Sequence, residues 1–335
     1  MWAGSPESTG LSRVQGRPSL RVRINRMRLY SRQRSPGAPR RNQTCGSPMT
    51  ISCPRQGRTG ARREALDSSR KHGTVSVRGV RTPYAEQGDP QGTPLVLVHA
   101  VGDSHRIFEG LLEHLPASIH AFAPTLRGHG DASKPPSGYR SNDFAADLAA
   151  FMDATHIGAA VIAGASSGGL VAQRFALDLP ERTLGLALLG SPLTFVDKPA
   201  AQALWDTAIA PLTDTTVPEF VRSFVGDTLS VPANAQGIDT VIRESLKVPA
   251  FVWRETLRGI LDDDFRAEIG RIAVPTLVVW GDADAVLPRE DQEAFTTLIA
   301  GARLAVVPGG GHMVYWDAPG PVADLLAAFV REVGA

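Results

Sequence analysis

The stretch Val161-Ile162-Ala163-Gly164-Ala165-Ser166-Ser167-Gly168-Gly169 decides the fold that this sequence predicts. Its apolar first residues are typical of a buried strand, and residues 170–179, which follow it, are typical of a helix. Glycines flank Ser166 at positions where side chains would collide across a tight bend. We therefore predict a strand, a sharp turn and a helix, with Ser166 at the apex in a strained conformation that exposes its hydroxyl.

Near-continuous apolar runs of strand length recur on both sides of this stretch. A strand that is apolar along its whole length is typical of a parallel sheet covered on both faces. Because helices alternate with these runs, the sequence predicts an α/β protein with a mostly parallel, eight-stranded sheet flanked by helices. The predicted strands lie at residues 74–80, 82–85, 94–99, 119–124, 161–163, 184–189, 275–280 and 304–307.

Helices are predicted in the intervals between these strands. Asp103 and Ser104 are both suited to cap the first helix, which extends to about residue 115. The other predicted helices span about residues 141–155, 167–179, 289–300 and 319–333.

Residues 192–266 interrupt the alternation of strands and helices. Helical segments are expected near 198–209, 218–225, 238–247 and 250–261, with no clear strand between them. The stretch is too long for an ordinary loop. We therefore expect an α/β core formed by residues 74–191 and 267–335, and a helical lid over the strand ends formed by residues 192–266.

The first 73 residues differ in composition from the rest of the chain. They carry 16 basic residues against three acidic ones, whereas the remainder carries 19 basic and 31 acidic residues. Because this segment is rich in Arg, Ser, Gly and Pro and poor in apolar runs, we expect it to be mostly disordered. Four interpretations stay open: an organelle transit segment, a nucleic-acid tether, a regulatory tail, or upstream sequence that is not translated, with initiation at Met49 for example.

Composition argues against several classes of protein. The chain is 43% hydrophobic, which is ample for a core, yet no run of 18 apolar residues predicts a membrane span. Both cysteines, Cys45 and Cys53, lie in the basic segment, so the folded part has no disulfide framework and no thiolate metal site. We expect a small-molecule substrate, no cofactor or metal, and no nucleic-acid or membrane partner for the folded domain. A cytoplasmic setting fits this cysteine usage.

Three residue types that nucleophilic catalysis requires follow predicted strands. A serine hydroxyl is a poor nucleophile at neutral pH and needs a base, which an acid must in turn orient. Ser166, Asp284 and His312 occur in that order along the chain, each just after a predicted strand. Because the carboxyl ends of parallel strands meet at one edge of a sheet, we expect these three side chains to lie close together.

Five motifs, distributed from one end of the predicted core to the other, carry a family resemblance. They are His99-Ala100-Val101-Gly102, Arg127-Gly128-His129-Gly130, the Ser166 turn, Gly281-Asp282-Ala283-Asp284 and Gly311-His312. With them, the chain from about residue 74 to residue 335 resembles the α/β-hydrolase superfamily, in its lid-bearing serine hydrolase branch.

This resemblance implies a role for each residue of the site. Ser166 would be the nucleophile, His312 the base and Asp284 the acid that orients it. The backbone N–H groups of Val101 and Ser167 would form the oxyanion hole.

The sequence departs from the family pattern at Ala100, where a glycine is common. Alanine disfavours positive φ, so an oxyanion turn that needs such an angle would be altered here. Asp282 competes with Asp284 for contact with the base, and we expect it to be a hydrogen-bonding loop residue instead. We interpret His129 as structural, and His99 as the anchor of its own turn through a buried hydrogen bond.

The function that follows is two-step acyl transfer on a small, mostly apolar carboxylic ester. Lactones and carbon–carbon bonds next to a carbonyl stay open as targets, and so does a ligand-binding relative that hardly turns over. Aromatic residues of the expected lid are the candidates for the pocket wall. They are Trp205, Phe220, Phe224, Phe251 and Trp253.

Overall fold

A computed structural model describes residues 70–196, 198–228 and 235–334. Residues 1–69 lie outside this described part, and the interpretations of the basic segment therefore stay predictions. The first strand begins at Lys71, three residues before the expected boundary of the folded part.

The centre of the molecule is one eight-stranded sheet with the order β1-β2-β4-β3-β5-β6-β7-β8. β2 pairs in antiparallel fashion with β1 and β4, and all other neighbours are parallel. The predicted mostly parallel sheet of an α/β fold is thus confirmed. The strands are β1 Lys71–Val77, β2 Val80–Gln87, β3 Thr93–Val98, β4 Ile119–Pro124, β5 Ala160–Ala165, β6 Thr183–Leu189, β7 Thr276–Gly281 and β8 Arg303–Val307.

The turn between the first two strands lies earlier in the chain than the predicted strand bounds placed it. Val77 pairs with Val80, so only Arg78 and Gly79 make the turn. Both have positive φ, 48° and 79°, which matches the right-handed twist of a two-residue hairpin. β1 therefore ends at Val77, whereas the predicted strand extended to residue 80.

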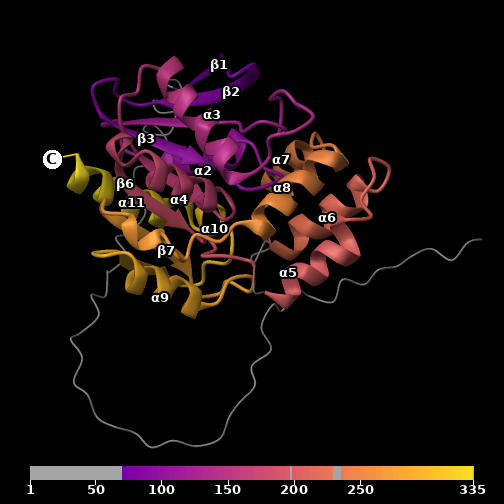
Figure 1. Cartoon of the computed structure of the whole chain (residues 1–335). Helices are drawn as coiled ribbons and strands as arrows, with labels where there is room; N and C mark the ends of the chain where they lie inside the picture. Colours follow the sequence, from indigo (N-terminus) through magenta and orange to yellow (C-terminus); the bar gives the residue numbers. More distant parts are fainter. Residues whose placement is uncertain (1–69, 197, 229–234, 335) are drawn as a thin grey trace, which may run out of the picture.

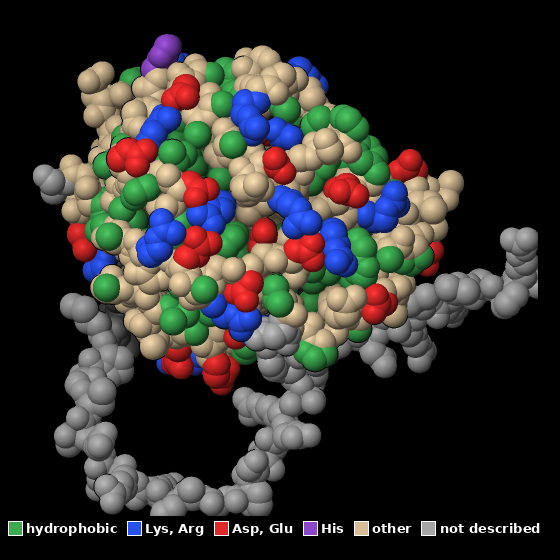
Figure 2. Space-filling view, viewed as in Figure 1, with side chains coloured by type: hydrophobic (Ala, Val, Ile, Leu, Met, Phe, Trp, Pro, Cys, Tyr) green, Lys and Arg blue, Asp and Glu red, His purple; other side chains and the backbone are tan. Residues whose placement is uncertain are grey.

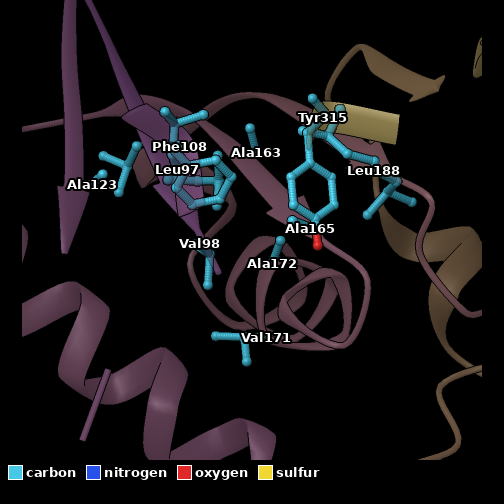
Figure 3. Packing of buried hydrophobic residues seen from close by; sticks show 14 of the residues in the cluster. Leu97, Val98, Phe108, Ala123, Ala163, Ala165, Val171, Ala172, Leu188 and Tyr315 are labelled. Atoms are coloured by element: carbon cyan, nitrogen blue, oxygen red, sulfur yellow. The ribbon is translucent and has the colours of Figure 1, made fainter. Parts of the chain in front are cut away.

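Helices cover both faces of the sheet. Leu97 and Val98 are consecutive residues of β3 and point to opposite faces. Figure 3 shows Phe108 on the side of Leu97, and Val171 on the side of Val98. η1 and α2 cover the face on the side of Leu97, and α3 and α4 cover the face on the side of Val98. Helical elements of the core are η1 His105–Phe108, α2 Glu109–His114, α3 Ser141–Ala154, α4 Gly168–Asp178, η2 Pro180–Arg182, η4 Ile269–Arg271, α9 Arg289–Leu298, α10 Val314–Asp317 and α11 Pro319–Val333.

The chain between β6 and β7 forms a helical segment of its own, which lies to one side of the sheet in Figure 1. Its elements are α5 Pro199–Leu204, the π-turn η3 Trp205–Ile209, α6 Val217–Thr228, α7 Ala235–Ser245 and α8 Ala250–Asp262. These correspond to the four helical stretches expected from the sequence. An isolated antiparallel bridge between Thr194 and Asp264 joins the two ends of this helical segment.

The surface of the described part carries charges of both signs. On the face shown in Figure 2, Lys and Arg side chains alternate with Asp and Glu, and no patch of one sign dominates this view of the described residues. Among those residues, no helix has the length and apolar character needed to cross a bilayer.

Candidate active site

Ser166 occupies the turn between β5 and α4 in a strained conformation. Its φ is 47°, in the left-handed region that L-residues with a side chain rarely adopt. A Cβ on Gly164 would lie 2.5 Å from the carbonyl oxygen of Gly168, and a Cβ on Gly168 would lie 2.5 Å from that of Val98. The glycines therefore allow a bend that brings the serine above the end of the sheet. The Ser166 N–H donates to the Leu189 carbonyl at 2.9 Å, which ties the apex to β6.

Ser166, His312 and Asp284 form one hydrogen-bonded chain. Ser166 Oγ lies 2.9 Å from His312 Nε2, and His312 Nδ1 lies 3.1 Å from Asp284 Oδ2. The other carboxylate oxygen, Oδ1, accepts the backbone N–H groups of Val286 and Leu287 at 2.8 and 2.9 Å. Because a carboxylate only accepts, it holds the proton on Nδ1 and leaves Nε2 free to accept the serine proton.

This hydrogen-bonded chain is buried, which strengthens its electrostatic interactions. The side chain of His312 is 6% exposed and that of Asp284 is fully buried. Hydrogen bonds to an ionised acceptor are stronger in such surroundings than in water. Ser166 comes from the end of β5, Asp284 from the loop after β7 and His312 from the loop after β8, so the parallel sheet itself brings the three together.

Asp282 has a different partner from Asp284. Its Oδ1 accepts the backbone N–H of Gly309 at 2.6 Å, which joins the loop after β7 to the loop after β8. The structure thus places Asp284 against His312 and Asp282 within the loop, as the sequence interpretation proposed.

The turn after β3 brings Val101 next to Ser167. The Val101 N–H donates to the hydroxyl oxygen of Ser167 at 2.9 Å. Ala100 does not adopt positive φ; the left-handed residue of this turn is Gly102, at φ 84°. The departure from glycine at position 100 therefore imposes no strain on the turn. The sequence did not predict the hydrogen bond from Val101 to the Ser167 side chain, because the motif around Ser166 gives no information on what that side chain contacts.

His99 anchors the turn after β3, and the ring of His129 lies 5.3 Å from the His99 ring. His99 is completely buried; its Nδ1 lies 2.8 Å from the Ala100 carbonyl, and its Nε2 accepts the Leu126 N–H at 2.9 Å. Burial lowers the pKa of His99 well below its usual value, and that of His129 to about 4. The His129 Nδ1 bonds the Arg127 carbonyl at 2.8 Å. Both rings are therefore neutral structural groups.

An apolar cavity of about 800 Å³, including its open mouth, begins at Ser166 and His312. Val101 and Ser167 also line it. Its walls are largely the apolar side chains of the helical segment. They include Phe195, Leu204, Phe220, Phe224, Leu257 and Ile260.

Two of the five aromatic candidates for the pocket wall line this cavity, namely Phe220 and Phe224. The prediction for Trp253 is wrong, because this ring is fully buried and packs edge-on against both phenylalanines at 5.1 and 5.4 Å. Trp205 is also not among the lining residues; the Arg258 guanidinium lies over its ring at 5.4 Å. Phe251 packs against Tyr139 instead.

Within residues 70–196, 198–228 and 235–334, no group of three or more His, Cys, Asp or Glu side chains is arranged to hold a metal ion. The geometry described above is a serine in hydrogen-bonding contact with a histidine at one end of an apolar cavity.

Comparisons with known proteins find similarity over most of the described part of the chain. A protein of Synechocystis sp. described as a candidate non-heme chloroperoxidase is 30% identical over 259 residues, which cover 72% of this chain and 92% of that protein. Lipase 1 of Psychrobacter immobilis is 26% identical over 75% of this chain and 81% of its own. The solved structure of a thermophilic esterase from Thermogutta terrifontis matches with a TM-score of 0.71 and 22% identity, over 79% of this chain and 100% of that one.

The family itself is identified by a match that covers most of the core. The model of the alpha/beta hydrolase family matches residues 95–325, from β3 to α11. The chain therefore belongs to the alpha/beta hydrolase family.

Proposed function

We propose that this hydrolase is a serine esterase that cleaves a small, mostly apolar carboxylic ester through an acyl-enzyme intermediate. The observation that carries the proposal is the hydrogen-bonded chain from Ser166 through His312 to Asp284 at the floor of an apolar cavity. The esterase and lipase among the similar proteins support the same class of reaction.

Acylation follows from the positions of the three side chains. His312 Nε2 accepts the hydroxyl proton of Ser166 as its oxygen attacks the ester carbonyl carbon. Asp284 keeps the imidazole oriented and stabilises the positive charge that it gains. When the tetrahedral intermediate collapses, the bond from carbon to the alcohol oxygen breaks, and the alcohol leaves with the proton from His312.

The negative oxygen of the intermediate needs donors beside Ser166. We assign the backbone N–H groups of Ser167, at the start of α4, and of Val101 to this role. The partial positive charge at the N-terminus of α4 acts in the same direction. A water molecule that gives its proton to His312 then attacks the acyl carbon. When this second intermediate collapses, the bond from carbon to Ser166 Oγ breaks, His312 returns the proton to that oxygen, and the acid is released.

The helical segment 192–266 acts in this proposal as the lid that excludes water and selects the substrate. Phe220 and Phe224 of α6, with Leu257 and Ile260 of α8, present an apolar wall to the acyl chain or the alcohol chain. Burying such a chain contributes about 0.8 kcal/mol per methylene group. We therefore expect specificity constants to rise with chain length until the cavity is filled.

A panel of 4-nitrophenyl esters of graded chain length tests this proposal on the full chain. The Ser166→Ala variant is expected to lose at least about 10⁴-fold in kcat. Ser118→Ala, an exposed serine between α2 and β4, is the matched control and is expected to retain its kcat. Ester turnover that survives in Ser166→Ala would overturn the proposal. Lactones and diketones in the same panel separate ester cleavage from the other bonds that the sequence leaves open.

A further inference from the structure

A second branch of the cavity shares Ser166, His312 and Thr228 with the apolar one and has other lining residues beyond them. It has a volume of about 390 Å³ including its open mouth, includes Ser166 and His312, and is lined by several residues with polar side chains. These are Asp103, Thr228, Ser245 and Tyr315. The proposed ester function uses none of them.

Asp103 is a buried acid without a structural partner. It follows Gly102 in the turn after β3 and is 6% exposed. Ser104, and not Asp103, caps η1, because its Oγ accepts the Arg106 N–H at 3.3 Å. The carboxyl group of Asp103 makes no hydrogen bond and no ion pair within the described part of the chain, whereas buried Asp147 pairs with Arg127 at 2.6 Å.

Burial without a partner keeps this carboxyl protonated. It raises the pKa of Asp103 to about 8, and desolvation is the cause. At neutral pH the group is therefore a neutral carboxylic acid, with one donor and free acceptor sites, in a residue that lines the cavity.

Tyr315 of α10 presents a second uncharged group to the same branch. It is 1% exposed, and its ring lies 5.8 Å from that of Phe108 (Figure 3). Its hydroxyl has no hydrogen-bond partner among the described residues. Burial and the nearby carboxyl groups of Asp103, Asp317 and Asp284 raise its pKa well above the usual value, so it too is neutral.

The lining of this branch carries no Lys or Arg among its described residues. An anionic group would therefore lose its hydration without gaining a cation, which is costly. An uncharged hydroxyl, carbonyl or amide would form hydrogen bonds with groups that are otherwise left unpaired, and each such bond favours binding.

We propose that Asp103 and Tyr315 form a polar subsite that binds an uncharged hydrogen-bonding group of the substrate, while an apolar chain fills the other branch. The inference rests on the proposed esterase function and adds to it the class of substrate. This class comprises esters with an apolar chain on one side of the scissile bond and a hydroxyl, carbonyl or amide on the other side or near it.

Pairs of esters that differ by one hydroxyl test the subsite. 4-Nitrophenyl butyrate with its 3-hydroxy counterpart places the group on the acyl side, and ethyl with 2-hydroxyethyl hexanoate places it on the alcohol side. In at least one pair we expect the wild type to favour the hydroxylated ester by tenfold or more in kcat/KM. Asp103→Leu should abolish this ratio and Tyr315→Phe should reduce it. Asp103→Asn, which keeps a neutral donor and acceptor, should retain the ratio within about threefold.

The two proposals fail in distinguishable ways. If simple esters are hydrolysed but neither pair shows the preference, or Asp103→Leu retains it, the subsite is overturned and the esterase function stands. If no ester is turned over, binding of the same ester pairs is measured by thermal shift. The two proteins compared are Ser166→Ala and the double variant that also carries Asp103→Leu. Tighter binding of the hydroxylated ester that depends on Asp103 supports the subsite without catalysis, and equal binding overturns it. Melting curves of each variant establish that it is folded.

Discussion

The backbone N–H of Val101 donates to the side-chain oxygen of Ser167 at 2.9 Å, next to the nucleophile candidate Ser166. The same N–H is one of the two groups assigned to the oxyanion. The hydroxyl of Ser167 therefore competes with the developing negative charge for one donor of the site.

Replacing Ser167 with alanine is expected to increase kcat/KM for simple esters about two- to fivefold. The change frees the Val101 N–H, and a neutral hydrogen bond of this kind is worth about 1 kcal/mol. Steady-state kinetics on 4-nitrophenyl butyrate measures the effect. A loss of tenfold or more would instead show that the Ser167 hydroxyl itself donates to the oxyanion.

Replacing Asp284 with asparagine is expected to lower kcat by about 10³-fold or more. The amide would donate to His312 Nδ1 and so favour the tautomer whose Nε2 carries the proton. Asp282→Asn is the matched control, because its amide oxygen still accepts the Gly309 N–H and it does not contact His312. Equal losses in the two variants would contradict the assignment of Asp284.

Replacing Asp103 with asparagine is expected to stabilise the protein at pH 8 more than at pH 5. The ordinary pKa of an aspartate is about 4, and burial raises that of Asp103 to about 8. Between these values the unfolded chain binds fewer protons than the folded one, so the unfolding free energy of the wild type falls as pH rises. Asparagine does not titrate, so the variant lacks this fall in unfolding free energy, which is on the order of 1 kcal/mol per pH unit.

Urea unfolding of both proteins at the two pH values measures this difference. An equal difference at pH 5 and pH 8 would show that Asp103 is ionised in the folded protein. The titratable groups that line the same cavity are Tyr315 and His312, the acids Asp284 and Asp317 act on Tyr315, and all four are the same in both proteins. The comparison therefore isolates position 103.

Replacing His129 with glutamine is expected to be less destabilising at pH 5 than at pH 7. The buried ring has its pKa lowered to about 4, whereas an unfolded histidine titrates near 6.5. Below pH 6.5 the unfolded wild type binds more protons, so its stability falls as the pH falls through this window towards 4. The variant lacks this loss, and the gap between the two unfolding free energies should narrow by on the order of 1 kcal/mol per pH unit. A constant gap would contradict a neutral, buried His129.

Replacing Trp253 with alanine is expected to cost about 3 to 5 kcal/mol of unfolding free energy. The ring is fully buried, and a Cβ on Gly102 would lie 2.2 Å from it, so it supports both the helical segment and the turn after β3. Trp205→Ala is the comparison, since Trp205 is only partly buried. Denaturant titrations measure both, and similar costs would contradict the packing described here.

Local patterns were sufficient to predict the strands, their order along the chain and the turn at Ser166. Continuous apolar runs indicate buried parallel strands, and the strand Ile119–Pro124 was predicted with its observed bounds. That Ser166, Asp284 and His312 meet could be inferred because each follows a parallel strand. The fold, not the spacing in sequence, brings their atoms within hydrogen-bonding distance.

Contacts between the helical segment and the core could not be predicted in the same way. Whether Trp253 faces the cavity or the interior depends on how α8 lies against Gly102, and no periodicity within α8 reveals this. The burial of Asp103 depends on α10 and α7, which are distant in sequence. A carboxyl in a turn is expected to be exposed, so its role is visible only in the assembled structure.

Covalent labelling of the full chain with a fluorophosphonate, followed by intact mass and Ser166→Ala in parallel, tests the central claim most directly. The reagent captures an activated serine whatever the natural substrate. The account predicts one adduct on the wild type, located at Ser166, and none on the variant. An unlabelled wild type, or an adduct that persists in Ser166→Ala, would contradict the claim that His312 and Asp284 activate Ser166.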